Sequence, residues 1–492
     1  MWTKEDLQKL IGEKMGDYKF IIVSNRQPYA HFFRKGKIEY RRGVGGVITA
    51  LDPIMQACNG TWIAYGSEEA DHVITDKDGK VKVPPDNPTY TLKRVRLTKE
   101  EESGYYYGFS NEALWPLCHM AFHRPVFRKT DWELYAKVNK KFADAVLEEV
   151  GDDKAFVFVQ DFHLTLLPKY LREEAGSRLI IAHFWHIPWP NYETFRICPQ
   201  KHEVLEGMLA NDLLGFHIRY HCDNFIDTID REMESKIDRE RFSVTRSDHE
   251  TLIRPYPISV DFEGIDKLSS SQDQKGIMEY FKEEYDLYDK KVLLGIDRID
   301  YTKGIPERLT AVDRFLDKYP EFKEKFVFLQ MGQLTRIHID EYKKLNDRIN
   351  ALVADINWKH LSDGWKPIIF VRRHSTLREI LALYRLSDIC IVSSLHDGMN
   401  LVAKEFISAK TDEDGVLMLS QFTGAARELG DAVLINPYDI EQFSEGIHEA
   451  FALSEDERKK RMAKMRQVAR NSNIYRWAGK ILSELLKFEF KE

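Results

Sequence analysis

A basic cluster follows an apolar stretch in the second half of the sequence. Residues 292–296 (VLLGI) lead into residues 297–304 (DRIDYTKG), and Pro306 suits the first turn of a helix that begins there. If residues 292–296 form a strand, Arg298 and Lys303 reach the same edge of its sheet. A guanidinium fork and a compact ammonium placed together would stabilise a departing diphosphate, whereas the alternative is two solvated basic side chains.

Two carboxylates follow another apolar run, residues 389–392. A helix that begins at Gly398 would carry Glu405 seven residues further on, nearly two turns along the same face. Asp397 and Glu405 then address one ligand, and because carboxylates accept hydrogen bonds from vicinal hydroxyls, we expect them to bind a sugar and a ribose. The main-chain N–H groups between them suit a phosphate, namely those of Gly398, Met399, Asn400, Leu401 and Val402. The other interpretation is a surface helix with one capping aspartate and one exposed glutamate.

A glycine-rich stretch, residues 43–46 (GVGG), follows SNR at 24–26 in the first half of the sequence. Glycines permit close approach of a backbone to a ligand, and a helix that starts after them offers N–H groups to a phosphate. The stretch matches neither the dinucleotide fingerprint nor the Lys-Ser/Thr ending of a P-loop. Two interpretations are therefore equal. Gly45 and Gly46 belong either to a ligand-binding loop or to a glycine turn without a ligand.

Several polar residues come directly after other apolar runs. Asp161 and His186, each at the end of such a run, could orient sugar hydroxyls or could cap a helix. His217 and His221 have the spacing of a helical metal pair, but no third ligand is recognisable nearby, so we interpret them as structural histidines. Arg336 follows its run after a short loop, and nothing local assigns it a role.

Short apolar runs recur along the whole chain, and their length suits strands that are covered on both faces. Helical patterns lie between most of them, as at residues 135–150, so we expect parallel sheets joined by crossover helices. The segment PYPIS (255–259) disfavours a helix, and we place a hinge near residue 258. The runs are residues 20–23, 62–65, 156–159, 179–184, 292–296, 326–329, 368–371, 389–392, 416–419 and 433–435.

These elements predict an α/β fold of two facing, doubly wound, Rossmann-like domains with a cleft between them. The first domain covers residues 1–258 and the second covers residues 259–476, followed by a helical tail at 477–492. In such sheets ligands bind beyond the carboxyl ends of the strands, which is where the cations, carboxylates and glycines described above fall.

The composition limits the partners and the location. With 72 basic and 79 acidic residues the formal net charge is −7, which argues against nucleic acid and anionic membranes as partners. The five cysteines are widely spaced without a CxxC pair, and the N-terminus lacks the basic and apolar regions of a signal peptide. We therefore expect a soluble, cytoplasmic enzyme.

Six segments together resemble the trehalose-6-phosphate synthase family of retaining glycosyltransferases, which have the two-Rossmann GT-B architecture. The match runs from about residue 20 to residue 478. It is carried by SNR (24–26), FSNEALWP (109–116), QDFHLTLLP (160–168), HIPWP (186–190), RIDYTKGIPER (298–308) and DGMNLVAKEF (397–406).

The resemblance implies which residues surround the two substrates. The acceptor sugar phosphate would be bound by Arg26, Tyr106, Trp115, Asp161 and Arg336, with the two arginines near its phosphate. The donor would be bound by Gly45, Gly46, His186, Arg298, Lys303, Asp397, Gly398, Met399, Asn400, Leu401, Val402 and Glu405. The residues nearest to the reaction would be His186, Asp161, Arg298 and Lys303.

The implied reaction makes α,α-trehalose 6-phosphate from a nucleotide-glucose, with UDP-glucose as the first choice, and glucose 6-phosphate. The acceptor oxygen would attack from the face that the diphosphate leaves, without a protein nucleophile, so that the configuration is retained. Two cations would take the place of a metal, and no cofactor is implied. The nucleotide is open among UDP, GDP and ADP, and a homo-oligomer is compatible with the family.

Three other functions stay open, one of which is a pseudo-glycosidic synthase that joins cyclitols, to which HIPWP (186–190) is also similar. A glucosylglycerol-phosphate synthase would need the same donor site and would use glycerol 3-phosphate, although SNR at 24–26 favours the trehalose branch. A catalytically silent sugar-phosphate sensor would keep the fold, but the intact cations and carboxylates argue against it. Turnover of the donor discriminates between an enzyme and a sensor.

Overall fold

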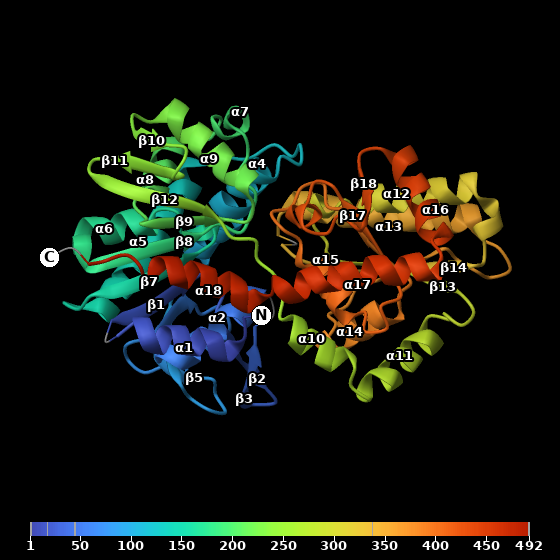
Figure 1. Ribbon diagram of the computed structural model, residues 1–492, viewed down its shortest axis with the longest axis horizontal. Helices are drawn as coiled ribbons and strands as arrows, with labels where there is room; N and C mark the ends of the chain where they lie inside the picture. The colour runs from blue at the N-terminus through green and yellow to red at the C-terminus, as the bar shows by residue number, and fades with distance from the viewer. Residues whose placement is uncertain (1, 17, 44–45, 337, 491–492) are drawn as a thin grey trace. The chain divides into compact units, whose positions relative to one another are not determined.

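The chain divides into two compact units, each with a sheet of its own (Figure 1). The computed structural model describes residues 2–16, 18–43, 46–336 and 338–490. Unit 1 contains Met1–Ile258 and Ile474–Glu492, and unit 2 contains Ser259–Asn473. Helices cover both faces of each sheet, so the fold belongs to the predicted α/β class with doubly wound sheets.

Unit 1 is built on a ten-stranded sheet in the order β10-β11-β12-β9-β8-β7-β1-β4-β6-β5. Its central strands are parallel, and antiparallel pairs occur only at the two edges among the strands described. The strands are β1 (Lys19–Ser24), β4 (Thr61–Tyr65), β5 (Lys80–Val83), β6 (Tyr90–Val95), β7 (Ala155–Gln160), β8 (Leu179–Phe184), β9 (Leu213–Phe216), β10 (Lys236–Asp238), β11 (Ser243–Arg246) and β12 (His249–Pro255). A separate hairpin is formed by β2 (Tyr29–Arg34) and β3 (Lys37–Arg42).

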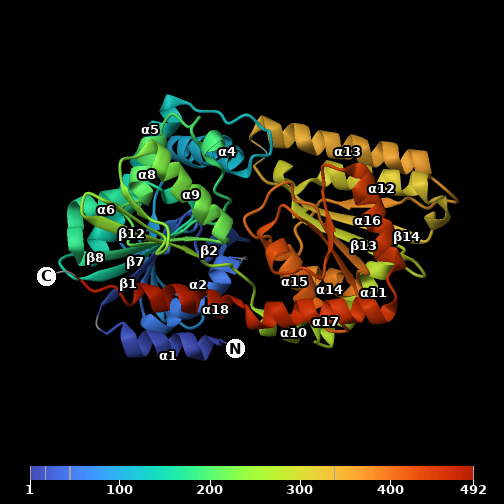
Figure 2. The ribbon, with the colours of Figure 1, turned by 45° about the horizontal axis from the view of Figure 1, so that its top comes forward.

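The helices of unit 1 form one layer on each face of this sheet (Figure 2). One layer contains α1 (Lys4–Lys14), α2 (Gly46–Cys58) and α18 (Ile474–Leu485). The other contains α5 (Lys129–Val150), α6 (Leu167–Ala175) and α8 (Lys201–Met208). The remaining helices are α3 (Lys99–Glu102), the π-helix η1 (Ser103–Leu114), α4 (Trp115–His119), η2 (Phe162–Leu164), η3 (Gly176–Arg178), α7 (Tyr192–Phe195) and α9 (Arg219–Glu232).

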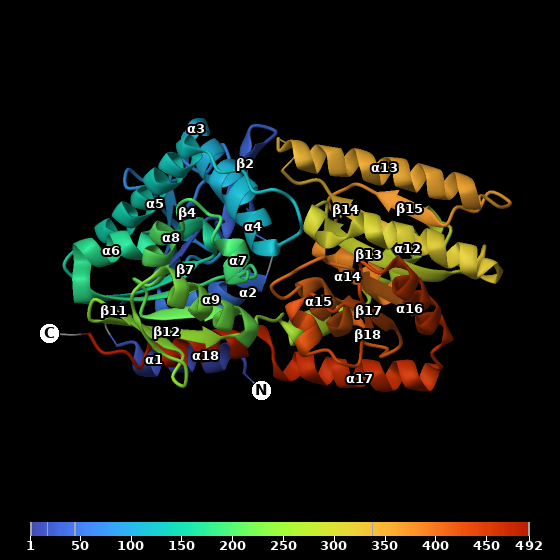
Figure 3. The same ribbon diagram turned by 90° about the horizontal axis from the view of Figure 1, so that it is seen from above.

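Unit 2 is built on a six-stranded parallel sheet in the order β15-β14-β13-β16-β17-β18. The strands are β13 (Lys291–Arg298), β14 (Phe326–Gln333), β15 (Ile368–Val371), β16 (Ile389–Val392), β17 (Val416–Ser420) and β18 (Val433–Ile435). One face is covered by α12 (Ile305–Lys318), α13 (Asp340–His360) and α16 (Ile440–Ala452), and the other by α10 (Phe262–Ser269), α11 (Asp273–Glu284), α14 (Leu377–Leu386), α15 (Leu401–Ala409) and α17 (Glu455–Asn471) (Figure 3). Short 3-10 turns are η4 (Tyr301–Lys303), η5 (Pro320–Phe322) and η6 (Gly424–Arg427).

The apolar runs of the sequence locate most of the buried strands but not β9, whose four residues are also buried. All ten predicted runs lie inside strands, and every residue of β7, β8 and β16 is buried, as expected for strands covered on both faces. The helix predicted at residues 135–150 is α5, whose last turn is followed by Gly151 with φ 60°.

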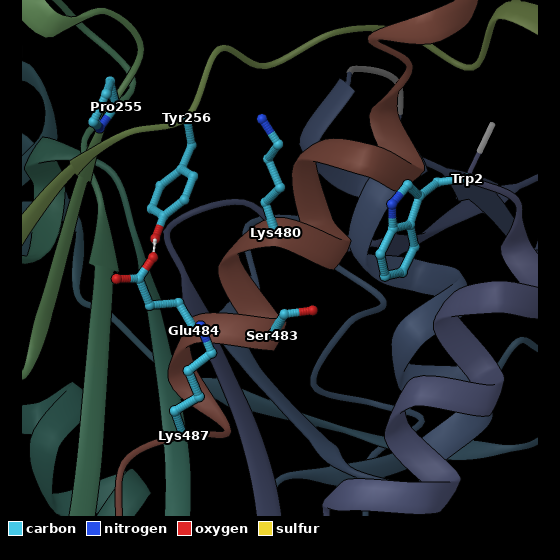
Figure 4. Close-up of a pocket in the computed structure, with 7 residues that line it drawn as sticks. All are labelled: Trp2, Pro255, Tyr256, Lys480, Ser483, Glu484 and Lys487. Atoms are coloured by element: carbon cyan, nitrogen blue, oxygen red, sulfur yellow. Dashed lines mark hydrogen bonds between the residues drawn. The ribbon is translucent and has the colours of Figure 1, made fainter.

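The C-terminal segment is not the separate tail that we expected at 477–492, because it packs within unit 1. Helix α18 begins at Ile474, and the Trp477 ring lies 5.1 Å from the Phe184 ring on β8. Figure 4 shows a pocket of about 380 Å³ beside α18, where the Tyr256 hydroxyl donates to the Glu484 carboxylate at 2.7 Å. The amphipathic helix thus completes the core of unit 1.

Among the described residues, none of the helices combines the length and the apolar character needed to cross a membrane.

Candidate active site

The predicted donor residues of unit 2 lie where the winding of its sheet reverses. Strands β13 and β16 are neighbours, but the chain leaves β13 towards β14 and leaves β16 towards β17, in opposite directions. The loops that follow them therefore diverge at the carboxyl edge and leave room for a ligand, as in other doubly wound sheets. Lys303 follows β13 and Asp397 follows β16, and both come to this point.

Lys303 and Asp397 are paired directly. The Lys303 Nζ lies 2.5 Å from Asp397 Oδ2, and both side chains are mostly buried. The two loops are also joined through their backbones, since the Leu395 N–H donates to the Thr302 carbonyl at 2.7 Å. We predicted from the sequence that Lys303 contacts a diphosphate and that Asp397 contacts a sugar. The structure brings the two side chains into one site.

Arg298 occupies the last position of β13 and is partly buried. Burial by itself raises the pKa of the nearby Asp300, but Arg336 and Arg298 outweigh it and hold that pKa below its ordinary value. Asp300 is therefore an anion between two arginines. The cluster keeps two guanidinium groups close to the carboxyl edge of the sheet.

Arg336 is held in place by two residues that sequence reasoning missed. Its Nη1 donates to the Tyr342 hydroxyl at 2.6 Å and lies 3.3 Å from Asp300 Oδ2, and the Tyr342 hydroxyl donates to the same carboxylate oxygen at 3.1 Å. Arg336 also has a positive φ of 50°, which a non-glycine residue seldom adopts. Helical spacing could not have suggested this contact from the sequence, because Arg336 precedes the first residue of α13, Asp340.

The helix that carries Glu405 begins later than predicted. Helix α15 starts at Leu401, because Asn400 caps it by accepting a hydrogen bond from the Ala403 N–H at 3.2 Å. Residues 397–400 form a loop, which is bound to a neighbouring loop by the Ala425 N–H that donates to the Met399 carbonyl at 2.8 Å. The predicted N–H groups of residues 398–402 thus belong to the loop and to the first turn of the helix.

Glu405 is a partly buried acid whose contacts differ from those of Asp397. Its Oε2 accepts a hydrogen bond from the Tyr384 hydroxyl at 3.1 Å, and Tyr384 is fully buried on α14. Burial raises the pKa of Glu405 to about 7, and the Tyr384 hydrogen bond opposes this only in part. Near neutral pH the carboxyl group therefore exchanges between acid and carboxylate.

We expect Glu405→Gln to remove a pH-dependent loss of stability. The folded protein holds the Glu405 proton more tightly than the unfolded chain, so stability falls as pH rises from the ordinary value of 4.5 to about 7. The glutamine variant cannot ionise and should be more stable than the wild type at pH 8 by about 3 kcal/mol, measured as urea unfolding across pH. Glu13→Gln on the exposed face of α1 is the control, and equal pH profiles for wild type and Glu405→Gln would contradict the expectation.

The predicted acceptor residues of unit 1 include two at the corresponding point of its own sheet. The winding reverses between β1 and β7, with Arg26 after the first strand and Asp161 after the second. Arg26 is exposed, and its carbonyl accepts a hydrogen bond from the Ser24 hydroxyl at 2.6 Å. Asp161 has a φ of 73°, and its Oδ1 accepts from the Phe162 N–H at 2.9 Å and the His186 N–H at 3.2 Å.

His186 is a neutral imidazole. Burial, followed by the charges of neighbouring histidines, holds its pKa well below the ordinary value. Its Nε2 donates to the Gln160 side-chain oxygen at 3.0 Å, which directs Nδ1 as the acceptor nitrogen. His217 donates from Nε2 to the His186 carbonyl at 3.0 Å, which links the two residues through the backbone of His186.

Tyr106 and Trp115 belong to an aromatic group near Asp161. The Tyr106 ring stacks on His163 with 5.7 Å between centroids, and the Trp115 ring lies 5.8 Å from Phe162. Tyr106 lies in the π-helix η1, whose Gly104 lets helix α5 approach so closely that an added Cβ would meet Leu134 at 2.4 Å. Such π-helical turns are common at functional sites.

The glycine stretch is only partly described. Gly45 lies outside the described residues, and Gly46 is the first residue of α2. The Gly43 N–H donates to the Pro28 carbonyl at 2.7 Å, and an added Cβ at Gly43 would lie 3.1 Å from the Gln27 carbonyl. The stretch thus begins in close contact with the segment that follows Arg26.

Comparison with known proteins identifies the family. Glycosyltransferase family 20 matches residues 18–487. A trehalose-6-phosphate synthase from Mycobacterium ulcerans is 34% identical over 482 residues, which are 96% of this chain and 95% of that protein. An alpha,alpha-trehalose-phosphate synthase [UDP-forming] from Pichia angusta is 32% identical over 95% of this chain and 98% of its own length.

Two solved structures are similar over nearly the whole chain. The E. coli protein bound with UDP-2-fluoro glucose has a TM-score of 0.86 at 28% identity, with coverage of 96% of this chain and 100% of that chain. An alpha,alpha-trehalose-phosphate synthase (UDP-forming) from Burkholderia xenovorans in complex with glucose-6-phosphate has a TM-score of 0.84 at 28% identity, with coverage of 95% and 100%. The chain therefore belongs to glycosyltransferase family 20. It is a glycosyltransferase of the trehalose-phosphate synthase type, as its motifs predicted.

Proposed function

We propose that this enzyme transfers glucose from UDP-glucose to glucose 6-phosphate and so makes α,α-trehalose 6-phosphate. The observation that carries the proposal is the site at the reversal point of unit 2, where Lys303 pairs with Asp397 beyond the strand ends and Arg298 ends strand β13. The names of the relatives support the same reaction, because they include a UDP-forming synthase and structures with a UDP-glucose analogue and with glucose-6-phosphate.

The donor would bind to unit 2 mainly through charge and hydroxyl recognition. Arg298 and Lys303 contact the diphosphate, Asp397 accepts hydroxyls of the transferred glucose, and Glu405 accepts the ribose hydroxyls. The N–H groups of residues 398–402 add donors for the diphosphate. In unit 1, Gly45, Gly46 and His186 are assigned to the donor as well.

The acceptor would bind through the residues assigned to its phosphate and its ring. Arg26 and Arg336 pair with the phosphate, since arginine offers a fork that matches phosphate oxygens. Tyr106, Trp115 and Asp161 contact the sugar, and the backbone of Asp161 is fixed by the Phe184 carbonyl, which accepts from its N–H at 2.7 Å.

The reaction would proceed with retention and without a protein nucleophile. The acceptor hydroxyl attacks the anomeric carbon from the face that UDP leaves, the carbon–oxygen bond to UDP breaks, and the hydroxyl proton passes to the departing phosphate oxygen. Because no covalent intermediate is formed, the barrier depends on stabilising the leaving charge and on aligning both substrates. His186, being neutral, contributes a dipole near the anomeric carbon without adding a charge that would compete for the diphosphate.

The proposal includes a cytoplasmic location, for which five free cysteines are suited. The proposal is compatible with a homo-oligomer, and the transfer reaction does not depend on one.

We expect purified protein to release UDP from UDP-glucose when glucose 6-phosphate is present, and to form an α,α-1,1-linked product. The measurement couples UDP release to product identification, with glycerol 3-phosphate as the alternative acceptor. Turnover only with glycerol 3-phosphate would leave the donor assignment in place and replace the acceptor. If neither acceptor causes nucleotide release from UDP-glucose, GDP-glucose or ADP-glucose, the result would instead support the sensor function.

A further inference from the structure

Arg308 is a fully buried arginine directly beneath the donor loops of unit 2. It lies on the first turn of α12, and its side chain has 0% exposure. A buried guanidinium is stable only when its charge and its N–H groups are paired. The groups that contact Arg308 should therefore explain why an arginine is present at this buried position.

Its partners lie on β13 and β14 and directly after β16, which are three adjacent strands. Nη1 lies 2.8 Å from Asp297 Oδ2 on β13 and donates to the Gln330 side-chain oxygen on β14 at 2.9 Å. Nε donates to the Ser393 hydroxyl, which directly follows β16, at 3.0 Å. One side chain thus joins β14, the carboxyl end of β13 and the residue that follows β16, and it contacts both sides of the point where the winding reverses.

Gly295 makes space for this arrangement. A Cβ added at Gly295 would lie 2.2 Å from Arg308 Nη1 and 2.6 Å from the Gln330 side-chain oxygen. No larger residue could occupy this position of β13 while the arginine stays where it is. The sheet is therefore shaped around the guanidinium.

The contact with Ser393 continues into the diphosphate loop. The Ser393 hydroxyl is 3.1 Å from the Lys303 carbonyl and 2.9 Å from the Gly304 carbonyl, so it donates to the backbone of the loop while it accepts from Arg308. Gly304 has a φ of 61°, and an added Cβ would lie 2.2 Å from the Ser393 carbonyl. The backbone position of Lys303 is thereby fixed relative to both strands.

We propose that Arg308, acting through Ser393, is a positioning residue that sets Lys303 for contact with the donor diphosphate. It touches no substrate itself. The inference rests on the proposed function for the identity of the ligand, and it adds the residue that preorganises the site. Preorganised charge is effective because the loop need not reorganise when the leaving group forms.

The test compares a nucleoside diphosphate with its monophosphate. We expect Ser393→Ala to weaken UDP binding about 5- to 10-fold, as is typical for loss of one hydrogen bond, and to leave UMP binding unchanged. In a Lys303→Ala background the same substitution should have no further effect on UDP, because the residue through which it acts is gone. Calorimetric titration of both nucleotides measures these affinities.

A second variant removes the arginine without leaving a buried charge. Arg308→Met combined with Asp297→Asn neutralises both partners, and we expect it to lower UDP affinity about 10²-fold with UMP affinity unchanged. Arg466→Met combined with Asp266→Asn is the matched control, because this pair is also largely buried in unit 2 but bonds to the carbonyls of Ile407 and Ser408 instead of the strand ends. The control should keep the UDP-to-UMP ratio even where its urea midpoint falls.

Equal losses of UDP and UMP affinity in both test variants, or unchanged UDP affinity in a folded variant, would overturn the inference. Failure of the wild type to bind UDP would count against the proposed donor alone, and the ratio would then be measured with ADP and AMP and with GDP and GMP. If no diphosphate binds more tightly than its monophosphate, the loop is no diphosphate site and the inference fails.

Discussion

Replacing Arg298 with alanine should lower turnover of the donor about 10²- to 10³-fold, which is typical for loss of one preorganised electrostatic contact in an active site. In the proposed reaction the largest change of charge occurs on the leaving diphosphate. Arg298 ends strand β13 at the edge where Lys303 also lies, so it would face this charge from a rigid element. The fall should appear in kcat more than in KM, because the contact strengthens as the bond breaks.

Two controls separate this effect from a change of fold. Arg298→Lys keeps the charge and loses the fork, so its turnover should lie between those of the wild type and the alanine variant. Arg314→Ala removes an exposed arginine of α12, paired with Glu441, and should leave turnover unchanged. Steady-state kinetics with UDP-glucose measure all three, and near-normal turnover of a folded Arg298→Ala would remove this residue from the site.

The apolar runs predicted ten of the strands, but they missed the fully buried β9 as well as strands in which charge interrupts the pattern. Strand β6 carries Lys93 and Arg94, which are 5% and 4% exposed and therefore belong to the core. They are tolerated there because partners distant in sequence neutralise them, including Glu149, which lies 3.2 Å from the Lys93 Nζ. A pattern of local hydrophobicity carries no information about such partners.

The residues of the candidate site likewise fall into two groups, those that the sequence indicates and those that only the structure reveals. Arg298, Lys303 and Asp397 could be proposed because they lie in the segments that follow apolar runs, at the edge where ligands bind in doubly wound sheets. Arg308 and Tyr342 could not, because each occupies a helical position where a polar side chain normally reaches water. Their roles depend on which strand ends and loops the topology brings beneath those helices.

Helix α18 was misplaced for a related reason. Its amphipathic pattern was visible, but the pattern does not say which surface its apolar face covers. Trp477 lies against aromatic residues of β7 and β8, and Gly479 lets Trp2 approach so closely that an added Cβ would lie 2.5 Å from its ring. These contacts join residues more than 290 positions apart, a separation that periodicity cannot bridge.

Replacing Arg94 with methionine should destabilise unit 1 by about 3 to 5 kcal/mol, because it leaves a buried aspartate without its cation. Arg94 Nη2 lies 3.1 Å from Asp71 Oδ1, and both side chains have 0% exposure. The same guanidinium donates to the Tyr29 carbonyl at 3.0 Å and to the His31 Nδ1 at 2.7 Å. Burial and the Arg94 charge lower the pKa of His31 to about 4, so this imidazole is neutral and able to accept.

This network holds the segment that directly follows Arg26, so its loss should also loosen the proposed acceptor site. Gln27 is bound from both sides, since Arg94 donates to its side-chain oxygen at 2.9 Å and its amide donates to Asp71 at 2.5 Å. Urea unfolding followed by tryptophan fluorescence measures the stability, and KM for glucose 6-phosphate should rise in the folded variant. Arg41→Met is the matched control, because its pair with Glu68 is exposed and should contribute less than about 1 kcal/mol. If the two variants have similar urea midpoints, the buried Arg94–Asp71 pair stabilises the protein no more than the exposed Arg41–Glu68 pair, and the prediction is wrong.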